Sequence, residues 1–141
     1  MRFLLDTCVI SELIKPRPSR IVDEWLDAQP EEHVFLSVLT LGEIARGVLL
    51  MPDGQKKRRL ETWLQHELKP RFAGRWISVN EEIAERWGII RVNAARQGLT
   101  MPVIDGLIAA TALVHGMTLV TRHDADVRAS GVIVLNPWKQ A

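Results

Sequence analysis

Short apolar segments alternate with longer stretches of helical periodicity, and this alternation restricts the folds open to the chain. We expect strands in five short segments, at residues 3–5, 34–36, 76–79, 118–121 and 132–134. Between them apolar residues recur every three or four positions, which predicts helices at 19–30, 40–50, 55–68, 80–98 and 103–114. Strands separated by helices require crossover connections, so the pattern predicts an α/β fold with a mainly parallel sheet and helices on both faces.

Capping and turn residues mark the ends of several predicted helices. Ser19 and Asn80 are good N-caps for the helices that they precede. A turn cluster at residues 51–54 follows the helix at 40–50, and Pro70 is expected to end the helix that begins at Gln55. We therefore expect each helix to be a separate element joined to its neighbours by a short connection.

The size and composition of the chain are those of one globular domain. It has 141 residues, of which 47% are hydrophobic and 25% charged, so it should fold around a core as a single domain over residues 1–141. Its apolar runs fall far short of the roughly 20 residues that cross a bilayer, so no membrane association is expected. A single cysteine, Cys8, forms no internal disulfide, and the first residues do not resemble a signal peptide. We expect a cytoplasmic protein.

Charge is balanced overall but contains one basic run. The chain has 18 Lys and Arg against 17 Asp and Glu, a net charge of +1. The run consists of Lys56, Lys57, Arg58 and Arg59. Such a run either contacts phosphates or forms the solvated face of a helix, and the sequence leaves both interpretations open.

Two acidic residues occupy positions where polar chemistry collects in a parallel sheet. Asp6 ends the first predicted strand, and ligands of open α/β sheets bind outside the carboxyl ends of the strands. It either caps the following turn with Thr7 or belongs to a site. Asp105 lies in an apolar helix, where an unpaired carboxylate costs several kcal/mol. A metal ion, a hydrogen-bond network or a basic partner must compensate it, which favours a functional site.

Other acids contribute to such a site only if the fold brings them together. On a helical wheel Glu43 lies opposite the apolar stripe of its helix, which predicts that it faces solvent. Asp124 and Asp126 lie in the loop after the fourth strand. If these acids converge, they form an oxygen-only site, which suits Mg²⁺ or Mn²⁺ and two-metal cleavage of phosphodiesters.

Several enzyme classes lack their defining residues in this chain. An aspartyl-nucleophile phosphatase needs a second acid two residues after Asp6, where Cys8 stands instead. The chain has no Gly-Lys-Ser/Thr phosphate loop, no dinucleotide fingerprint, no Gly-x-Ser-x-Gly elbow and no Cys or His cluster with zinc spacing. These absences leave metal-dependent phosphodiester chemistry as the enzyme hypothesis with support.

Four motifs in order resemble the PIN-domain nucleases. They are the run Asp6-Thr7-Cys8-Val9-Ile10-Ser11-Glu12, Glu43 in the helix after the second strand, Asp105-Gly-Leu-Ile-Ala-Ala-Thr-Ala, and Leu119-Val-Thr-Arg122. More narrowly, the chain resembles the VapC toxins of bacterial type II toxin-antitoxin systems. Ala73-Gly74-Arg75 and Asn136-Pro137-Trp138 are similar to the FitB-like branch of those toxins.

The resemblance implies a fold, an activity and partners. It implies a three-layer α/β/α sandwich, a magnesium-dependent endoribonuclease in which Mn²⁺ can replace Mg²⁺, and a homodimer. It also implies a cognate antitoxin encoded nearby, in an assembly that binds promoter DNA through the antitoxin. The alternatives from the residues are a metal-dependent nuclease acting on DNA and a non-enzymatic nucleic-acid-binding regulator. Carboxylates repel the phosphate backbone unless a cation intervenes, which argues against the regulator.

The same resemblance assigns the site residues. Asp6 and Asp105 match acids that hold the metal directly, and Glu43 matches one that positions a water or a second ion, which reverses its local interpretation. His123 stands where the family often has Asn or Asp, and Asp124 and Asp126 come next in the loop. We expect the fourth acid to be Asp124, because it lies nearest the end of the strand, with Asp126 as the next choice. From their charge, Arg122 or the basic run with Lys56 and Lys57 is expected to hold flanking phosphates of the substrate, and the basic run could equally face the antitoxin.

Overall fold

A five-stranded parallel sheet forms the centre of the computed structural model, which describes residues 1–139. The order of the strands is β3-β2-β1-β4-β5, and each neighbouring pair is parallel. The strands are β1 (Phe3–Leu5), β2 (Val34–Ser37), β3 (Trp76–Ile77), β4 (Thr118–Val120) and β5 (Val134–Leu135). The parallel α/β fold predicted from the alternation of segments is confirmed.

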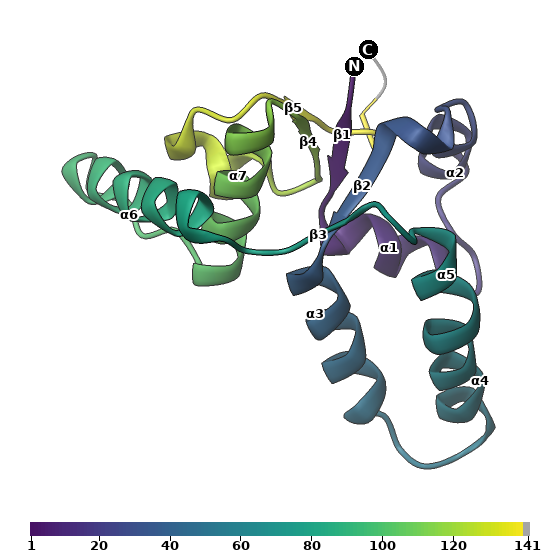
Figure 1. Ribbon diagram of the computed structural model, residues 1–141. Helices are drawn as coiled ribbons and strands as arrows, with labels where there is room; N and C mark the ends of the chain where they lie inside the picture. Colours follow the sequence, from purple (N-terminus) through teal and green to yellow (C-terminus); the bar gives the residue numbers. More distant parts are fainter. Residues whose placement is uncertain (140–141) are drawn as a thin grey trace.

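Helices cover both faces of this sheet (Figure 1). The helices are α1 (Thr7–Leu13), α2 (Arg20–Asp27), α3 (Val38–Leu49), α4 (Gln55–Trp63), α5 (Lys69–Arg71), α6 (Glu81–Arg96), α7 (Val103–His115) and α8 (Asp124–Val127). A π-helix, η2 (Leu64–Leu68), joins α4 to α5, and short 3-10 turns form η1 (Glu31–His33) and η3 (Arg128–Ser130). Figure 1 shows α6 and α7 on one side of the strands and α1, α2 and α5 on the other, with α3 and α4 extending past the end of β1.

Alternate residues of the central strand β1 pack on opposite faces of the sheet. Phe3 and Leu5 pack in the core under α1, α2 and η2, whereas Leu4 packs in the core under α7. Leu4 and Leu5 are completely buried, and full burial of such a side chain contributes roughly 1.5–3 kcal/mol. The continuous apolar run at residues 3–5 predicts a strand buried on both faces, and β1 is indeed the middle strand of the sheet.

The N-terminal helix α1 is the main element that the sequence pattern misses. It starts directly after Asp6, whose side chain caps it. The predicted turn at this point is therefore the first turn of a seven-residue helix that buries Val9, Ile10 and Glu12. A carboxylate among the buried residues interrupts the apolar stripe, so helical periodicity alone does not show it.

Pro70 does not end the helix that begins at Gln55. The chain continues through η2 and α5, and the helix-type bond from Phe72 N–H to the Leu68 carbonyl crosses Pro70. Pro70 lies in the first turn of α5, where a missing N–H costs little.

Smaller boundary differences occur near the last two strands. The strand predicted at 132–134 lies at Val134–Leu135, and the loop predicted to carry Asp124 and Asp126 is the short helix α8. The helix predicted at 103–114 is α7, which ends at Gly116 with a φ of 64°. None of the helices in the described residues combines the length and the hydropathy needed to cross a membrane.

Candidate active site

Asp6 ends the central strand, and both of its carboxylate oxygens are hydrogen-bonded. Oδ1 accepts from the backbone N–H of Thr7 at 2.8 Å, and Oδ2 accepts from the hydroxyl of Thr121 at 2.7 Å. The backbone N–H of Asp6 donates to the Val120 carbonyl at 2.9 Å. Because Asp6 is 6% exposed and bonded at each oxygen, its carboxylate is fixed in one orientation. Asp6 thus caps α1 and also lies at the edge of the sheet where ligands collect.

Glu43 lies on the exposed side of α3, as the helical wheel predicts, yet its carboxylate is hydrogen-bonded to Thr7, the residue after Asp6. Oε1 accepts from the hydroxyl of Thr7 at 2.5 Å. The Thr7 oxygen lies 3.1 Å from the hydroxyl oxygen of buried Thr40. Since the single hydroxyl proton of Thr7 goes to Glu43, Thr40 must be the donor to Thr7. This chain of hydroxyls orients Glu43 beside the residue that follows Asp6.

Asp105 is half-buried in the first turn of α7. Burial raises the pKa of its carboxyl most, and the negative charges of Asp6 and then Asp126 raise it further. His123 opposes this rise, and Glu43 adds to it. Within the described chain no Lys or Arg forms an ion pair with Asp6, Glu43 or Asp105. The charges around Asp105 therefore repel its carboxylate, and only His123, not an ion pair with Lys or Arg, opposes that repulsion.

The structure brings Asp126, rather than Asp124, toward Asp105. Asp126 is among the charges that raise the pKa of Asp105, and its Oδ2 lies 4.0 Å from His123 Nδ1. Asp124 Oδ2 instead lies 3.8 Å from the Lys139 ammonium. Residues two apart on a helix point in nearly opposite directions, so α8 separates the two acids. The sequence preference for Asp124 assumed an irregular loop, in which nearness to the strand end decides.

The oxygen atoms of these side chains suit a hard divalent cation, but they do not surround a single ion position closely. Carboxylate and hydroxyl oxygens are the ligands that Mg²⁺ and Mn²⁺ prefer. Among residues 1–139, no three His, Cys, Asp or Glu side chains are close enough to coordinate one ion together. Mg²⁺ commonly keeps several waters and takes only one or two protein carboxylates. The unneutralised charge around Asp105 therefore fits a cation held partly through water.

The three basic residues expected to hold phosphates have different surroundings. The Arg122 guanidinium lies over the Trp138 ring, 4.4 Å from its centroid. Lys57 Nζ donates to the Leu49 carbonyl at 3.2 Å and to Asp53 Oδ1 at 3.3 Å, so it is engaged at the end of α3. Lys56 lines the same groove as Glu43. Of these residues, Lys56 has surroundings that best suit a phosphate beside the acids.

Cys8 lies next to Asp6, but its thiol is not activated as a nucleophile. Burial raises the pKa of its thiol, and the Asp6 charge raises it further. Its Sγ lies 3.6 Å from the Thr121 hydroxyl oxygen and 3.8 Å from Asp6 Oδ2. A protonated thiol in this position supports the packing around Asp6 and takes no part as a thiolate.

Sequence reasoning missed the hydroxyl residues that orient the acids. The sequence indicates Thr7 only as a partner of Asp6 in a turn and Thr121 only as part of a motif, and it gives no signal for Thr40. A hydroxyl directly after a strand-end acid is a usable signal, because it extends the polar edge of the sheet. Thr40 gives no such signal, since only the packing of α3 on α1 brings it to Thr7.

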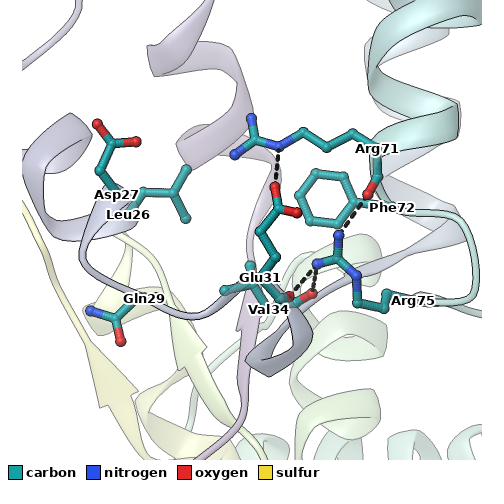
Figure 2. A pocket seen from close by; sticks show the side chains of 8 residues that line it. All are labelled: Leu26, Asp27, Gln29, Glu31, Val34, Arg71, Phe72 and Arg75. Carbon is teal, nitrogen blue, oxygen red and sulfur yellow. Dashed lines mark hydrogen bonds and ion pairs between the residues drawn. The ribbon is translucent and has the colours of Figure 1, made fainter.

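A second cavity, of about 150 Å³, lies at the opposite end of β2, and its side chains do not form a second candidate active site (Figure 2). Its arginines are already engaged. The Arg75 guanidinium donates to the carbonyls of Glu31, Val34 and Arg71 at 2.5, 2.6 and 2.6 Å, and lies over the Phe72 ring. Arg71 pairs with Glu31 at 3.4 Å. Arg75 therefore fastens the start of β2 to α5, which gives the Ala73-Gly74-Arg75 motif a structural role.

Comparison with known proteins identifies the family. The PIN domain matches residues 3–131, a range that contains β1 to β4 and all the acids described above. This chain belongs to the PIN-domain family. The predicted α/β/α sandwich is the fold of this PIN domain, with its parallel sheet between two helical layers.

Relatives of this PIN domain share nearly its whole length. Toxin FitB of Neisseria gonorrhoeae is 42% identical over 135 residues, which cover 96% of this chain and 97% of that protein. The VapC ribonuclease Y4jK of Sinorhizobium fredii is 36% identical over 138 residues, which cover 98% and 99%. The predicted resemblance to VapC toxins of the FitB-like branch is confirmed.

Solved structures agree with the PIN assignment. A chain in the structure of FitAB bound to the IR36 DNA fragment superposes with a TM-score of 0.94 at 40% identity, covering 99% of this chain and 97% of that one. VapBC2 of Rickettsia felis, bound to a DNA fragment from its promoter, gives a TM-score of 0.78 at 23% identity and covers 96% and 98%. The second comparison bears on the fold alone.

Proposed function

We propose that this protein is the toxin of a type II toxin-antitoxin pair, and that it is a magnesium-dependent endoribonuclease. The observation that carries the proposal is the position of Asp105, whose carboxyl pKa is raised by burial and by the charges of Asp6 and Asp126 without an ion pair from Lys or Arg. A cation offsets such a cluster, and a phosphate backbone approaches carboxylates only across a cation. Relatives named as ribonucleases support RNA as the substrate.

We assign the roles of the acids from their surroundings. Asp6, fixed by Thr7 N–H and the Thr121 hydroxyl, and Asp105 would hold the cation, and Asp126 would complete the polar surroundings. A divalent cation in this position supplies charge stabilisation at the phosphate and a water of lowered pKa. Glu43, oriented by the Thr7 hydroxyl, would accept a hydrogen bond from the attacking water and hold its proton. Manganese is expected to replace magnesium, because the donors are oxygens.

A groove beside the acids offers a place for RNA or for an antitoxin segment. It has a volume of about 390 Å³ and is lined by Thr7 and Glu43 at one end, by Lys15 and Lys56, and by apolar residues of α3 and α4. Its mixed polar and apolar lining suits a peptide, and its lysines suit a phosphate. We propose that the antitoxin occupies this groove and so blocks access to Glu43. One relative with a known structure is named as a toxin-antitoxin complex from Klebsiella pneumoniae, and another, FitAB, is bound to a DNA fragment. These names support an assembly that binds promoter DNA through the antitoxin.

We also propose that the protein forms a homodimer. The helix α6 exposes Ile89 and Val92, at 56% and 50% exposure, three positions apart on one face. Leu99 and Val103, at 50% and 55%, follow in the connection to α7 and its first residue. Exposed apolar side chains in neighbouring positions are typical of association surfaces. Light scattering of the purified protein measures the mass directly, and a monomer at all concentrations would contradict this part of the proposal.

The experiment that tests the activity is a cleavage assay with purified protein. Single-stranded RNA should be cut with Mg²⁺ and left intact with excess chelator, and Asp6→Asn and Asp105→Asn should lose cleavage while remaining folded. Asp124→Asn serves as the matched control, because Asp124 pairs with Lys139. Cutting of DNA in preference to RNA would favour the DNA-nuclease alternative. Binding of nucleic acid without cutting under any metal would favour the non-enzymatic regulator.

A further inference from the structure

The segment 136–139, after β5, contacts the turn that follows β4. Trp138 provides the main contact, since the Arg122 guanidinium lies over its ring at 4.4 Å from the centroid. Lys139 Nζ lies 3.8 Å from Asp124 Oδ2. The segment is itself a turn, because Asn136 Oδ1 accepts from Trp138 N–H at 3.0 Å and the Asn136 carbonyl accepts from Lys139 N–H at 3.2 Å. The Trp138 ring is therefore held at a defined place against the turn after β4.

A buried carboxylate on α1 anchors the same ring. Trp138 Nε1 donates to Glu12 Oε1 at 3.1 Å, and Glu12 is 5% exposed. Burial alone would raise the pKa of Glu12, but hydrogen bonds from Lys15, Trp138 and the N–H of Ser19 lower it overall. Arg122 Nη1 lies 4.0 Å from the same Oε1. A buried, charged carboxylate needs such partners. Glu12 therefore fixes the Trp138 ring through a hydrogen bond and attracts the Arg122 guanidinium electrostatically.

Arg122 lies between two residues that belong to the acidic site. Thr121, before it, donates its hydroxyl proton to Asp6 Oδ2 at 2.7 Å. The same hydroxyl oxygen accepts from the N–H of His123, after it, at 3.0 Å. The His123 carbonyl accepts from Asp126 N–H at 3.0 Å and so begins α8. A displacement of Arg122 would therefore be transmitted to Asp6 on one side and to Asp126 on the other.

We propose that Trp138 is a positioning residue for the acidic site: it stacks on Arg122 and, through Arg122, fixes the turn at 121–123 that orients Asp6 and places Asp126. The side-chain partners of Trp138 described above are Arg122 and Glu12, neither of which is assigned to the cation site, and Arg122 is the one that adjoins Thr121 and His123. This inference rests on the proposed function for its consequence in catalysis, but the coupling between Trp138 and the turn is a property of the fold. The Asn136-Pro137-Trp138 motif, which the catalytic assignment did not use, thereby acquires a role.

Hydrogen-deuterium exchange of the full chain tests the coupling without requiring any activity. In Trp138→Ala the amides of residues 121–126 should exchange roughly tenfold faster, because the local opening of this turn becomes easier. Trp138→Phe keeps a ring for Arg122 and loses only the N–H to Glu12, so it should accelerate exchange less. Trp25→Phe is the matched control. Trp25 lies on α2 and packs edge-on against Phe3, with the ring centroids 5.1 Å apart. It is not the ring that stacks on Arg122 or bonds Glu12.

Unchanged exchange at 121–126 in a folded Trp138 variant would overturn the proposal, and so would equal acceleration in Trp25→Phe. If Trp138→Ala does not fold, Trp138→Phe decides the question by the same comparison. Arg122→Gln tests the route of the coupling. It should accelerate the same amides, and the double variant with Trp138→Phe should exchange no faster than the faster single variant. Multiplied effects in the double variant would contradict a route through Arg122.

RNA cleavage then separates this proposal from the proposed function. Trp138→Ala should lower kcat several-fold with little change in KM, because the acids are misoriented while the groove at Lys56 is intact. Trp138→Phe should lower kcat less, since it keeps a ring for Arg122. Trp25→Phe should leave both values unchanged. A wild-type protein that cuts no RNA would refute the proposed function, and the exchange result would still decide whether Trp138 positions the turn. An active Trp138→Phe with a changed KM alone would contradict the positioning role.

Discussion

At the scale of single residues, Asp105 carries a destabilising charge at the position where we propose that a cation binds. Its pKa is raised by burial and by the charges of Asp6, Asp126 and Glu43. The native state therefore binds a proton more tightly than the unfolded chain does. In metal-free buffer this lowers the stability of the native state as the pH rises from the ordinary Asp range through the raised pKa, and the loss persists above it.

The first prediction follows from this sign. Without metal, Asp105→Asn should be more stable than wild type at neutral pH, because the amide removes the repulsion. The advantage should shrink as the pH falls through the raised pKa and disappear below about 3, where Asp105 is protonated in both states. Urea unfolding of both proteins across this range measures the difference. Asp124→Asn, which loses its partner Lys139, should show no such gain, and a gain equal to that of Asp105→Asn would refute the electrostatic account.

Thr7 gives a second prediction at this scale. Thr7→Val removes the hydroxyl that holds Glu43 Oε1 at 2.5 Å but keeps the shape of the side chain. RNA cleavage should fall about 10- to 100-fold, as is typical when a group that orients a site residue is lost. Thr111→Val is the matched control, since the Thr111 hydroxyl bonds the Leu107 carbonyl inside α7. Full activity in Thr7→Val would show that Glu43 needs no such orientation.

The sequence predicts the strand-end acid and the acid in the apolar helix, because each is anomalous in its own segment. Asp6 and Asp105 could be singled out by local pattern alone. Glu43 could not, because its side chain does lie on the exposed side of α3, and only the contact with Thr7 across α1 and α3 links it to the site. Its assignment came from the resemblance to the family.

At the scale of elements, the sheet and the long helices follow from periodicity, whereas the short helices do not. The helices α1 and α8 have seven and four residues, too few to show a clear helical repeat. The choice between Asp124 and Asp126 depended on this point, since a helix at 124–127 sends residues two apart in opposite directions. The π turn at Leu64–Leu68 likewise leaves no sequence signal that distinguishes it from a helix ended by Pro70.

Helix α3 carries both Thr40 and Glu43, so its N-terminal cap matters to the site. The Ser37 hydroxyl oxygen accepts from Leu39 N–H at 3.0 Å and is fully buried. Ser37→Ala should lower the free energy of unfolding by about 1 to 2 kcal/mol. Ser19→Ala, at the more exposed and longer cap of 3.4 Å on α2, should cost less. Chemical denaturation of both variants checks the order, and a larger loss at Ser19 would contradict it.

At the scale of the whole molecule, the parallel sheet collects acids that are far apart in the sequence. Asp6 ends the central strand β1, β4 leads into the turn that places Asp126, and β2 leads into α3 with Glu43. Helix α7 packs across the other face and brings Asp105 to the same edge. The fold therefore concentrates negative charge at one end of the sheet, and we propose that a divalent cation binds there.

Thermal unfolding with and without Mg²⁺ tests this central claim most directly. A ligand that binds only the native state stabilises it by about 2.7 kcal/mol at a hundredfold excess over Kd. Saturating Mg²⁺ should therefore raise the Tm of wild type clearly, and the shift should be much smaller in Asp105→Asn, whose Tm without metal should already exceed that of wild type. An equal Mg²⁺ shift in both proteins, or a Tm of Asp105→Asn below that of wild type without metal, would contradict the convergence of the acids on one cation site.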